Sequence, residues 1–184
     1  QLISPVNGSN SLGLSRAALY RRLYWRHYLR VPEHWVGHGG DKLSRAMILA
    51  SPEHWGQAMI AHVWSGGVEG GPGSHLVIDP ASGVRPGGTL ATTAYNDFPN
   101  LRWLGLASSR TPFFEAAQRG EWRCVEAHVA LDDPGRGNGV FRLWVDGALE
   151  AERIGLEWVG SFQEYGLNAL FVENYWDEGA PATQ

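Results

Sequence analysis

Alternation of apolar and polar side chains is the main structural signal in this sequence. The segment WRCVEAHVAL, residues 122–131, places Val, Ala, Val and Leu on one face and Cys, Glu and His on the other. The segment GVFRLWV, residues 139–145, alternates in the same way, with Phe, Leu and Val opposite Arg and Trp. A period of two is typical of a strand with one buried face, so both segments are predicted to be strands.

The two segments also predict their own pairing. Between them lies DDPGRGN, residues 132–138, which consists of turn-forming residues. If Leu131 pairs with Gly139, apolar residues meet on one face and polar residues on the other, whereas a slip of one residue would mix the faces. The predicted pairs are Val129 with Phe141, Ala127 with Leu143, Val125 with Val145, Glu126 with Trp144, and His128 with Arg142. The following dipeptide, Asp146-Gly147, predicts a hairpin turn with positive φ at both positions.

Further strands are predicted along the rest of the chain. Residues 19–31 alternate from Leu23 onward, and Tyr24, Arg26, Tyr28 and Arg30 share one face. Strands are also expected over 42–50 and 57–64 and over 75–78, the last closed by Asp79-Pro80. Residues 1–18 form an irregular lead-in with at most one short strand, and 113–119 hold one helical turn. Regularly spaced strands with almost no helix predict an all-β fold, an antiparallel β-sandwich.

Composition limits the functional classes. A chain of 184 residues fits one domain, with boundaries 1–184. The net charge of −4 comes without a basic patch, which argues against a nucleic-acid partner, and no apolar run is long enough to cross a membrane. The single cysteine, Cys124, excludes an internal disulfide. The 9 Trp, 6 Tyr and 24 Gly are typical of short strands and tight turns, in which flat rings can serve as binding platforms for sugars.

Several segments resemble a known family. They are YWRHYLRVPEHW, the Gly-Gly-x-Lys of residues 39–42, GEWRCVEAHVAL and DDPGRGNGVFRLWVDG. Together they resemble the concanavalin A-like jelly-roll polysaccharide lyases, in particular the alginate and glucuronan lyase-like groups. The resemblance implies a jelly roll of the lectin/glucanase type, secretion or export to the periplasm, a monomer, and an anionic polysaccharide lying on the concave face of one sheet. It also implies a further strand after ENYWDEGAP, which is expected to be missing from residues 1–184.

Two departures from that family affect the chemistry. The lyases often carry an Arg on the strand that matches 57–64, where this chain has Ala61 and His62, and a Tyr pair on the next strand, which reads His75-Leu76-Val77-Ile78 here. Only Lys42, in its Gly-Gly-x-Lys setting, carries over from the family pattern. The first prediction is a polysaccharide lyase that cleaves a uronate-containing chain by β-elimination, and these departures keep a protein that only binds the chain as the alternative.

A uronate lyase needs a group that neutralises the carboxylate, a base that takes the C5 proton, and an acid that protonates the leaving oxygen. The polar strand faces offer His128 or Lys42 as the base and Tyr28 as the acid. The predicted substrate-binding residues are Arg26, Arg30, Glu126, Arg142, Trp144, Gln57, His62 and Asn174, with Arg26 and Arg142 as neutralisers.

Other interpretations of the polar strand faces stay open. Each of these polar faces is also compatible with an ordinary solvated sheet surface, and the stem of an exposed Arg covers apolar surface in either case. A binding module of the same fold without catalysis is the first alternative. Glycoside hydrolysis ranks third, with Glu126 and Glu173 as the best pair of carboxylates. No metal site and no cofactor is predicted, because the seven His are scattered, although a structural calcium ion at Asp132 and Asp133 is compatible with the fold.

Overall fold

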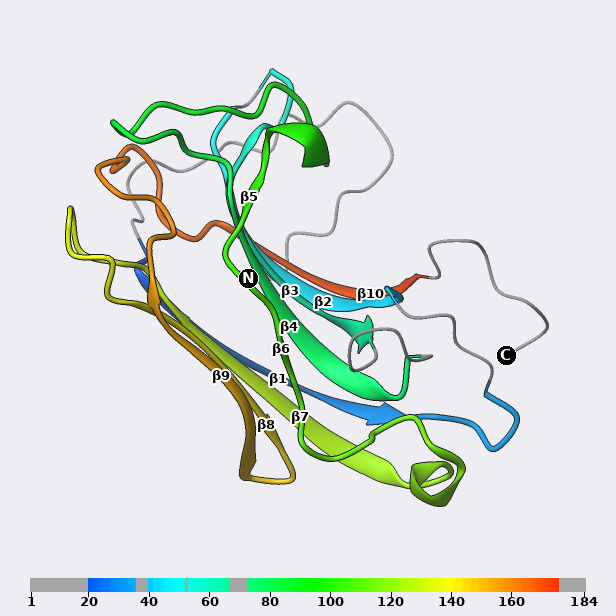
Figure 1. Ribbon diagram of the computed structural model, residues 1–184. Coiled ribbons are helices and arrows are strands. Elements are labelled where there is room, and N and C mark those ends of the chain that lie inside the picture. Colours follow the sequence, from blue (N-terminus) through cyan, green and yellow to red (C-terminus); the bar gives the residue numbers. More distant parts are fainter. Residues whose placement is uncertain (1–19, 36–39, 52, 67–72, 176–184) are drawn as a thin grey trace.

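The computed structural model describes residues 20–35, 40–51, 53–66 and 73–175, which form two antiparallel β-sheets packed face to face (Figure 1). The four-stranded sheet has the order β1-β7-β8-β9, and the larger sheet has the order β10-β2-β3-β4-β5, with β6 also paired to β4. The bounds in the four-stranded sheet are β1 Arg22–Arg30, β7 Trp122–Ala130, β8 Gly139–Val145 and β9 Ala148–Leu156. The bounds in the six-stranded sheet are β2 Lys42–Leu49, β3 Gln57–Gly66, β4 His75–Ser82, β5 Arg102–Trp103, β6 Ala107–Ser108 and β10 Ala169–Tyr175.

The predicted fold class is confirmed, since the chain is an antiparallel β-sandwich compatible with a jelly roll. The two helices of the described residues are single 3₁₀ turns, η1 Phe98–Asn100 and η2 Ala116–Gln118, and the second lies within the predicted helical turn. No helix in this part of the chain has the length and apolar character to cross a membrane.

The predicted hairpin register is also confirmed. All five predicted pairs between β7 and β8 are Cα partners in the sheet, from Val125 with Val145 to Val129 with Phe141. The turn that follows has positive φ at both positions, 49° at Asp146 and 81° at Gly147. The alternation of β1 is as expected, because Trp25 is buried while Tyr24 and Arg26 are exposed.

One predicted boundary was wrong. Strand β4 does not end at Asp79-Pro80 but continues through Pro80 to Ser82. The two backbone polar groups of a residue in an antiparallel strand point to the same neighbouring strand. The carbonyl of Pro80 accepts a hydrogen bond from the Leu104 amide (2.8 Å), so the proline nitrogen faces the break between β5 and β6. The missing N–H therefore costs no ladder bond, and this is a position where a strand tolerates proline.

The core lies between the two sheets, and a second apolar cluster covers the opposite face of the six-stranded sheet. The core includes Phe141 and Leu143 of β8 and Ile48 of β2, all fully buried. The second cluster gathers Met47, Ile60 and side chains of the connection after β4. The six-stranded sheet is therefore covered on both faces, as its nearly continuous burial also indicates. The interpretations made for residues 1–18 and for Gly39 fall outside the described residues.

Candidate functional site

Three ionisable residues lie side by side on the outer face of the six-stranded sheet, the face that points away from the four-stranded sheet. Arg45 of β2 pairs with His62 of β3, and His62 pairs with Asp79 of β4. Their chain neighbours Ala46 and Ala61 belong to the core between the sheets. Because successive side chains of a strand point to opposite faces, the three side chains project to the outer face.

Arg45 is the most heavily bonded of these residues. Its guanidinium donates to Asn96 Oδ1 (3.0 Å), to the hydroxyl of Tyr95, and to Glu173 Oε1 (2.8 Å), with which it forms an ion pair. It also packs against the rings of Tyr95 and Phe171. Burial raises the pKa of the Tyr95 phenol, so this hydroxyl stays protonated at neutral pH. The cluster therefore holds a cation, a carboxylate and a phenol in contact.

His62 belongs to a cluster of three stacked rings with Trp64 and Trp103, whose two indole centroids are 6.1 Å apart. Its ring stacks on Trp64 at 4.3 Å and on Trp103 at 5.8 Å, measured between ring centroids. Burial, with the positive charges of Arg45 and Lys42, lowers the pKa of His62 to about 3. The imidazole is therefore neutral at physiological pH and offers one donor and one acceptor nitrogen. Neither ring nitrogen makes a well-formed hydrogen bond to the described residues, although the backbone of Asp79 lies close enough to offset part of the lowering of the His62 pKa.

Lys42 and Asp79 lie at the two sides of this cluster. The ammonium of Lys42 lies 4.1 Å from the ring centroid of Tyr175 and 5.9 Å from that of Phe98. Asp79 lies on the other side of His62, and burial raises its pKa to about 6. A carboxyl group with this pKa changes its charge close to neutral pH, which is a common property of groups in functional sites.

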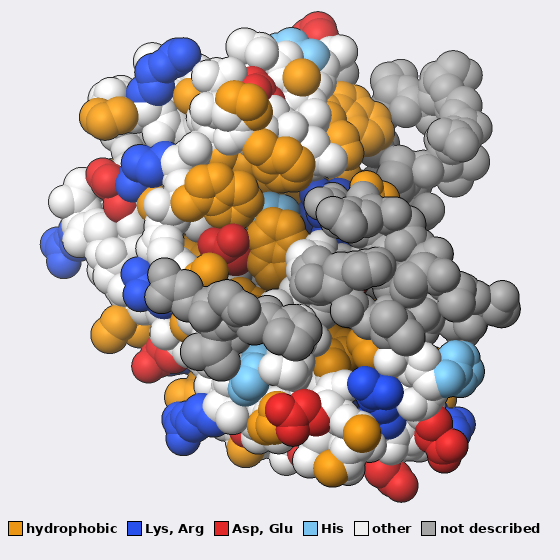
Figure 2. Space-filling model, turned by 45° about the vertical axis from the view of Figure 1, so that its right-hand side comes forward, with side chains coloured by type: hydrophobic (Ala, Val, Ile, Leu, Met, Phe, Trp, Pro, Cys, Tyr) orange, Lys and Arg blue, Asp and Glu red, His pale blue; other side chains and the backbone are white. Residues whose placement is uncertain are grey.

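Unpartnered buried polar atoms are concentrated here. Nε of Arg45, both ring nitrogens of His62 and Oε2 of Glu173 are buried without a hydrogen bond. A buried polar group without a partner costs free energy, so several of them in one place point to a ligand or to ordered water. Figure 2 shows a hollow on this side of the molecule, in which hydrophobic side chains surround an acidic group next to His and basic groups. We take this outer face as the candidate site.

The structure divides the residues predicted from the sequence between two opposite surfaces. One group belongs to β1, β7 and β8 of the four-stranded sheet and lies on the face that points away from the core. The full set on that surface is Tyr28, Arg26, Arg30, Glu126, His128, Arg142 and Trp144.

The remaining predicted residues belong to the six-stranded sheet. Lys42 and His62 are part of the candidate site described above. Gln57 is fully buried, donates a hydrogen bond to the sulfur of Met47 and accepts one from the backbone amide of Asn96. It therefore helps to position Asn96, which in turn accepts a hydrogen bond from Arg45. Asn174 is exposed on the edge strand β10. Lys42 therefore does not share a site with His128 or Tyr28, because the two sheets place them on opposite surfaces.

The predicted hydrolase pair is wrong for the same reason. Glu126 belongs to β7 of the four-stranded sheet and Glu173 to β10 of the six-stranded sheet, and both side chains face outward. Stacked sheets are separated by about 10 Å, so two outward carboxylates lie too far apart to flank one glycosidic bond.

The two aspartates named for calcium have other bonds. Both carboxylate oxygens of the fully buried Asp132 accept backbone N–H groups, from Val159 and Gly160, and Asp133 bonds to Asn138. Within the described ranges no group of three or more His, Cys, Asp or Glu is arranged to hold a metal ion. The calcium ion stays a prediction.

Sequence reasoning missed Arg45, Asp79, Tyr95 and Trp103. Arg45 and Asp79 each interrupt an otherwise apolar strand, and a charged residue in such a strand is the signal that could have found them. Tyr95 and Trp103 lie in or beside the long connection after β4, where periodicity is weak.

Comparison with known proteins adds no relative, since no family model, curated protein or solved structure matches the chain. The resemblance to polysaccharide lyases therefore stays a prediction from the sequence.

Proposed function

We propose that this protein binds a uronate-containing polysaccharide on the outer face of the six-stranded sheet. The observation that carries the proposal is the cluster of three stacked rings formed by His62, Trp64 and Trp103, in which both buried nitrogens of His62 lack a well-formed hydrogen bond to the described residues. Sugar rings have apolar faces and hydroxyl edges, so a binding site for them combines aromatic surfaces with polar groups that lack partners.

The charges of the site favour a sugar that carries a carboxylate. Lys42 and Arg45 are both buried cations of β2, and their positive charges are felt at His62. Glu173 neutralises part of the charge of Arg45, but its contact involves only one terminal nitrogen. A carboxylate bound between these cations would be favoured by short-range attraction in a partly dehydrated hollow.

Cleavage by β-elimination is the second candidate, favoured by one specific arrangement. Arg45, His62 and Tyr95 carry groups of the three required types on one face: a cation for the carboxylate, a neutral imidazole for the C5 proton, and a protonated phenol for the leaving oxygen. His62 is 1% exposed, so proton transfer to it requires a neighbouring side chain to move aside. The C5–H bond breaks, a C4–C5 double bond forms and the C4–O bond breaks. An imidazole with a pKa near 3 is a weak base, and the carboxylate of a bound uronate would raise this pKa by offsetting the cations.

Calorimetric titration with oligomers of galacturonate, alginate and glucuronan tests the binding proposal. Trp103→Ala removes an exposed indole of the site and is expected to weaken binding by roughly tenfold, the effect of about 1.4 kcal/mol. Tyr20→Ala removes an exposed aromatic residue elsewhere and is the matched control. Equal affinity of both variants and the parent would place any binding on another surface.

Ultraviolet absorbance of the unsaturated uronate tests elimination. If the parent protein produces this signal, His62→Gln is expected to abolish it, while His128→Gln, on the opposite sheet, leaves it intact. The reverse result would move the chemistry to the four-stranded sheet. Binding without any absorbance change would leave a non-catalytic binding module.

A further inference from the structure

The outer face of the four-stranded sheet exposes an unusual number of aromatic rings. Tyr24, Tyr28 and Trp122 are 69%, 62% and 64% exposed, and Trp144 is half-buried beside them. Tyr24 and Tyr28 point the same way from β1, and Trp122 lies on the neighbouring strand β7. Scattered exposed apolar residues are ordinary, but rings gathered on one sheet face mark an interaction surface.

The same face is cationic. Four arginines project from it against two glutamates, a balance of two positive charges. These residues are Arg22, Arg26, Arg30, Arg142, Glu126 and Glu152. Arg142 pairs with Glu152, and Arg26 makes only a long contact of 3.8 Å with Glu126. Within the described part of the chain, Arg22 and Arg30 form no ion pair. This surface therefore has positive charge to offer, although the whole chain carries −4.

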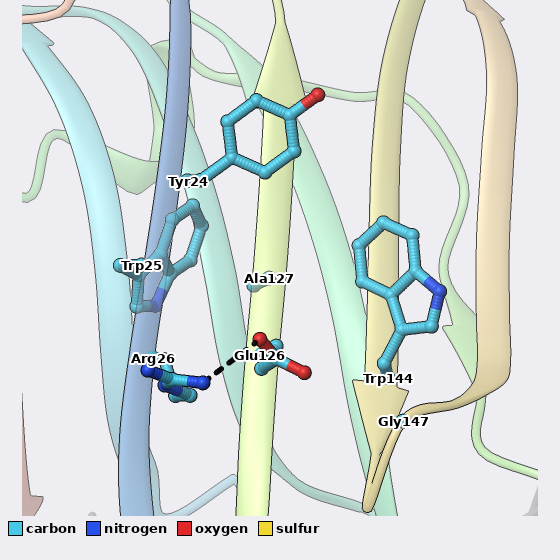
Figure 3. Close-up of a pocket in the computed structure, with 7 residues that line it drawn as sticks. All are labelled: Tyr24, Trp25, Arg26, Glu126, Ala127, Trp144 and Gly147. Carbon is cyan, nitrogen blue, oxygen red and sulfur yellow. Dashed lines mark ion pairs between the residues drawn. The ribbon is translucent and has the colours of Figure 1, made fainter.

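A shallow pocket of about 530 Å³ lies between these groups. Figure 3 shows Arg26 of β1 and Trp144 of β8 on either side of Glu126, with Arg26 directed toward the glutamate and the Tyr24 ring farther along the sheet. The Tyr24 ring covers His128, stacked at 4.0 Å with an interplanar angle of 13°. Both nitrogens of His128 are buried without a partner, and its pKa is lowered by burial and by Arg142 and Arg22.

We propose that the outer face of the four-stranded sheet is a second glycan-binding surface, which takes a carbohydrate chain that carries carboxylates. The exposed rings stack on sugar faces, Arg22 and Arg30 pair with carboxylates, and Glu126 accepts hydrogen bonds from hydroxyls. Glu126 needs hydroxyl donors, which every ring of a sugar chain carries, and this makes a sugar chain a better match than a nucleic acid. This inference holds whether or not the outer face of the six-stranded sheet binds a glycan.

NMR titration of the full chain with an oligogalacturonate hexamer tests the proposal. The resonances of His128 and of the Trp144 indole are expected to shift, and the pKa of His128 to rise because a bound carboxylate offsets the two arginines. The methyl-esterified hexamer, which has the same rings without charge, is the matched ligand control and should bind roughly tenfold more weakly, the effect of one charge-assisted hydrogen bond.

Variants separate the two surfaces. Tyr24→Ala combined with Arg26→Ala is expected to abolish the Trp144 shifts and to leave those of the His62 ring unchanged. Trp103→Ala is expected to raise the ligand concentration needed for the His62 shifts by roughly tenfold and to leave the Trp144 shifts unchanged. The proposal is overturned if the hexamer leaves His128 and Trp144 unshifted, or if a single-stranded oligonucleotide binds this face more tightly than the hexamer. Shifts at His128 without shifts at His62 would support this surface and contradict the function proposed above.

Discussion

The ion pair between Arg45 and Glu173 makes a quantitative prediction about stability. The side chain of Arg45 is 4% exposed and that of Glu173 is 17% exposed, and the two atoms in contact are 2.8 Å apart. Glu173→Ala leaves the guanidinium buried without its counter-charge. Breaking a buried pair in this way typically costs roughly 3–5 kcal/mol.

The lower end of that range is expected here. Arg45 keeps its hydrogen bonds to Tyr95 and Asn96 in the variant, and Glu173 is itself partly hydrated in the parent. We therefore expect a loss of about 3 kcal/mol in the free energy of unfolding. For a domain of this size each kcal/mol lowers Tm by roughly 2–4 °C, so the expected change is roughly 6–12 °C.

Thermal unfolding followed by circular dichroism measures the effect, with Glu157→Ala as the control. Glu157 forms an ion pair of 3.4 Å with Arg102, and both side chains are exposed, so its loss should cost less than about 1 kcal/mol. If the two variants melt at the same temperature, the buried pair contributes no more than a surface pair. That outcome would refute the argument that Arg45 depends on Glu173.

Three further predictions concern the core, the pH dependence and the hairpin. Leu143→Asp places a charge among fully buried apolar residues and should prevent folding, which the loss of the β-sheet circular dichroism signal would show; a folded variant would contradict the assigned facing of β8. The pKa of Asp79 is raised from 3.8 to about 6, so the native state holds the Asp79 proton more tightly than the unfolded state does. The parent should therefore lose stability relative to Asp79→Asn as the pH rises through this interval. Urea midpoints of both proteins between about pH 4 and 7 test this, and a difference that does not change with pH would count against it. Gly147 has a φ of 81°, so Gly147→Ala should cost about 1 kcal/mol in the free energy of unfolding, and an unchanged urea midpoint would argue against the turn geometry.

Features that depend on near neighbours could be predicted from the sequence. The facing of β1, the strands β7 and β8, the five cross-strand pairs between them and the turn at Asp146-Gly147 all follow from a period of two and from turn chemistry. These features can be read locally because one face of each strand is buried and the other is solvated. In a strand of this kind, the sequence alone indicates which side chains face the core.

Which polar residues meet became apparent only from the packing of the strands. Strand β2 is buried at every position, since the core covers one face and a second apolar cluster covers the other, so no alternation reveals that Arg45 points outward. The residues around Arg45 come from three other segments: His62 from β3, Glu173 from β10 and Tyr95 from the connection after β4. The lengths of the connections in the sequence do not indicate that these segments lie next to β2. Likewise, nothing local in the sequence separates His128 from Lys42, because the sheet that each strand joins is fixed by pairings between distant segments. The residue types of a site were therefore visible in the sequence, whereas their division between two opposite surfaces depended on long-range strand pairing.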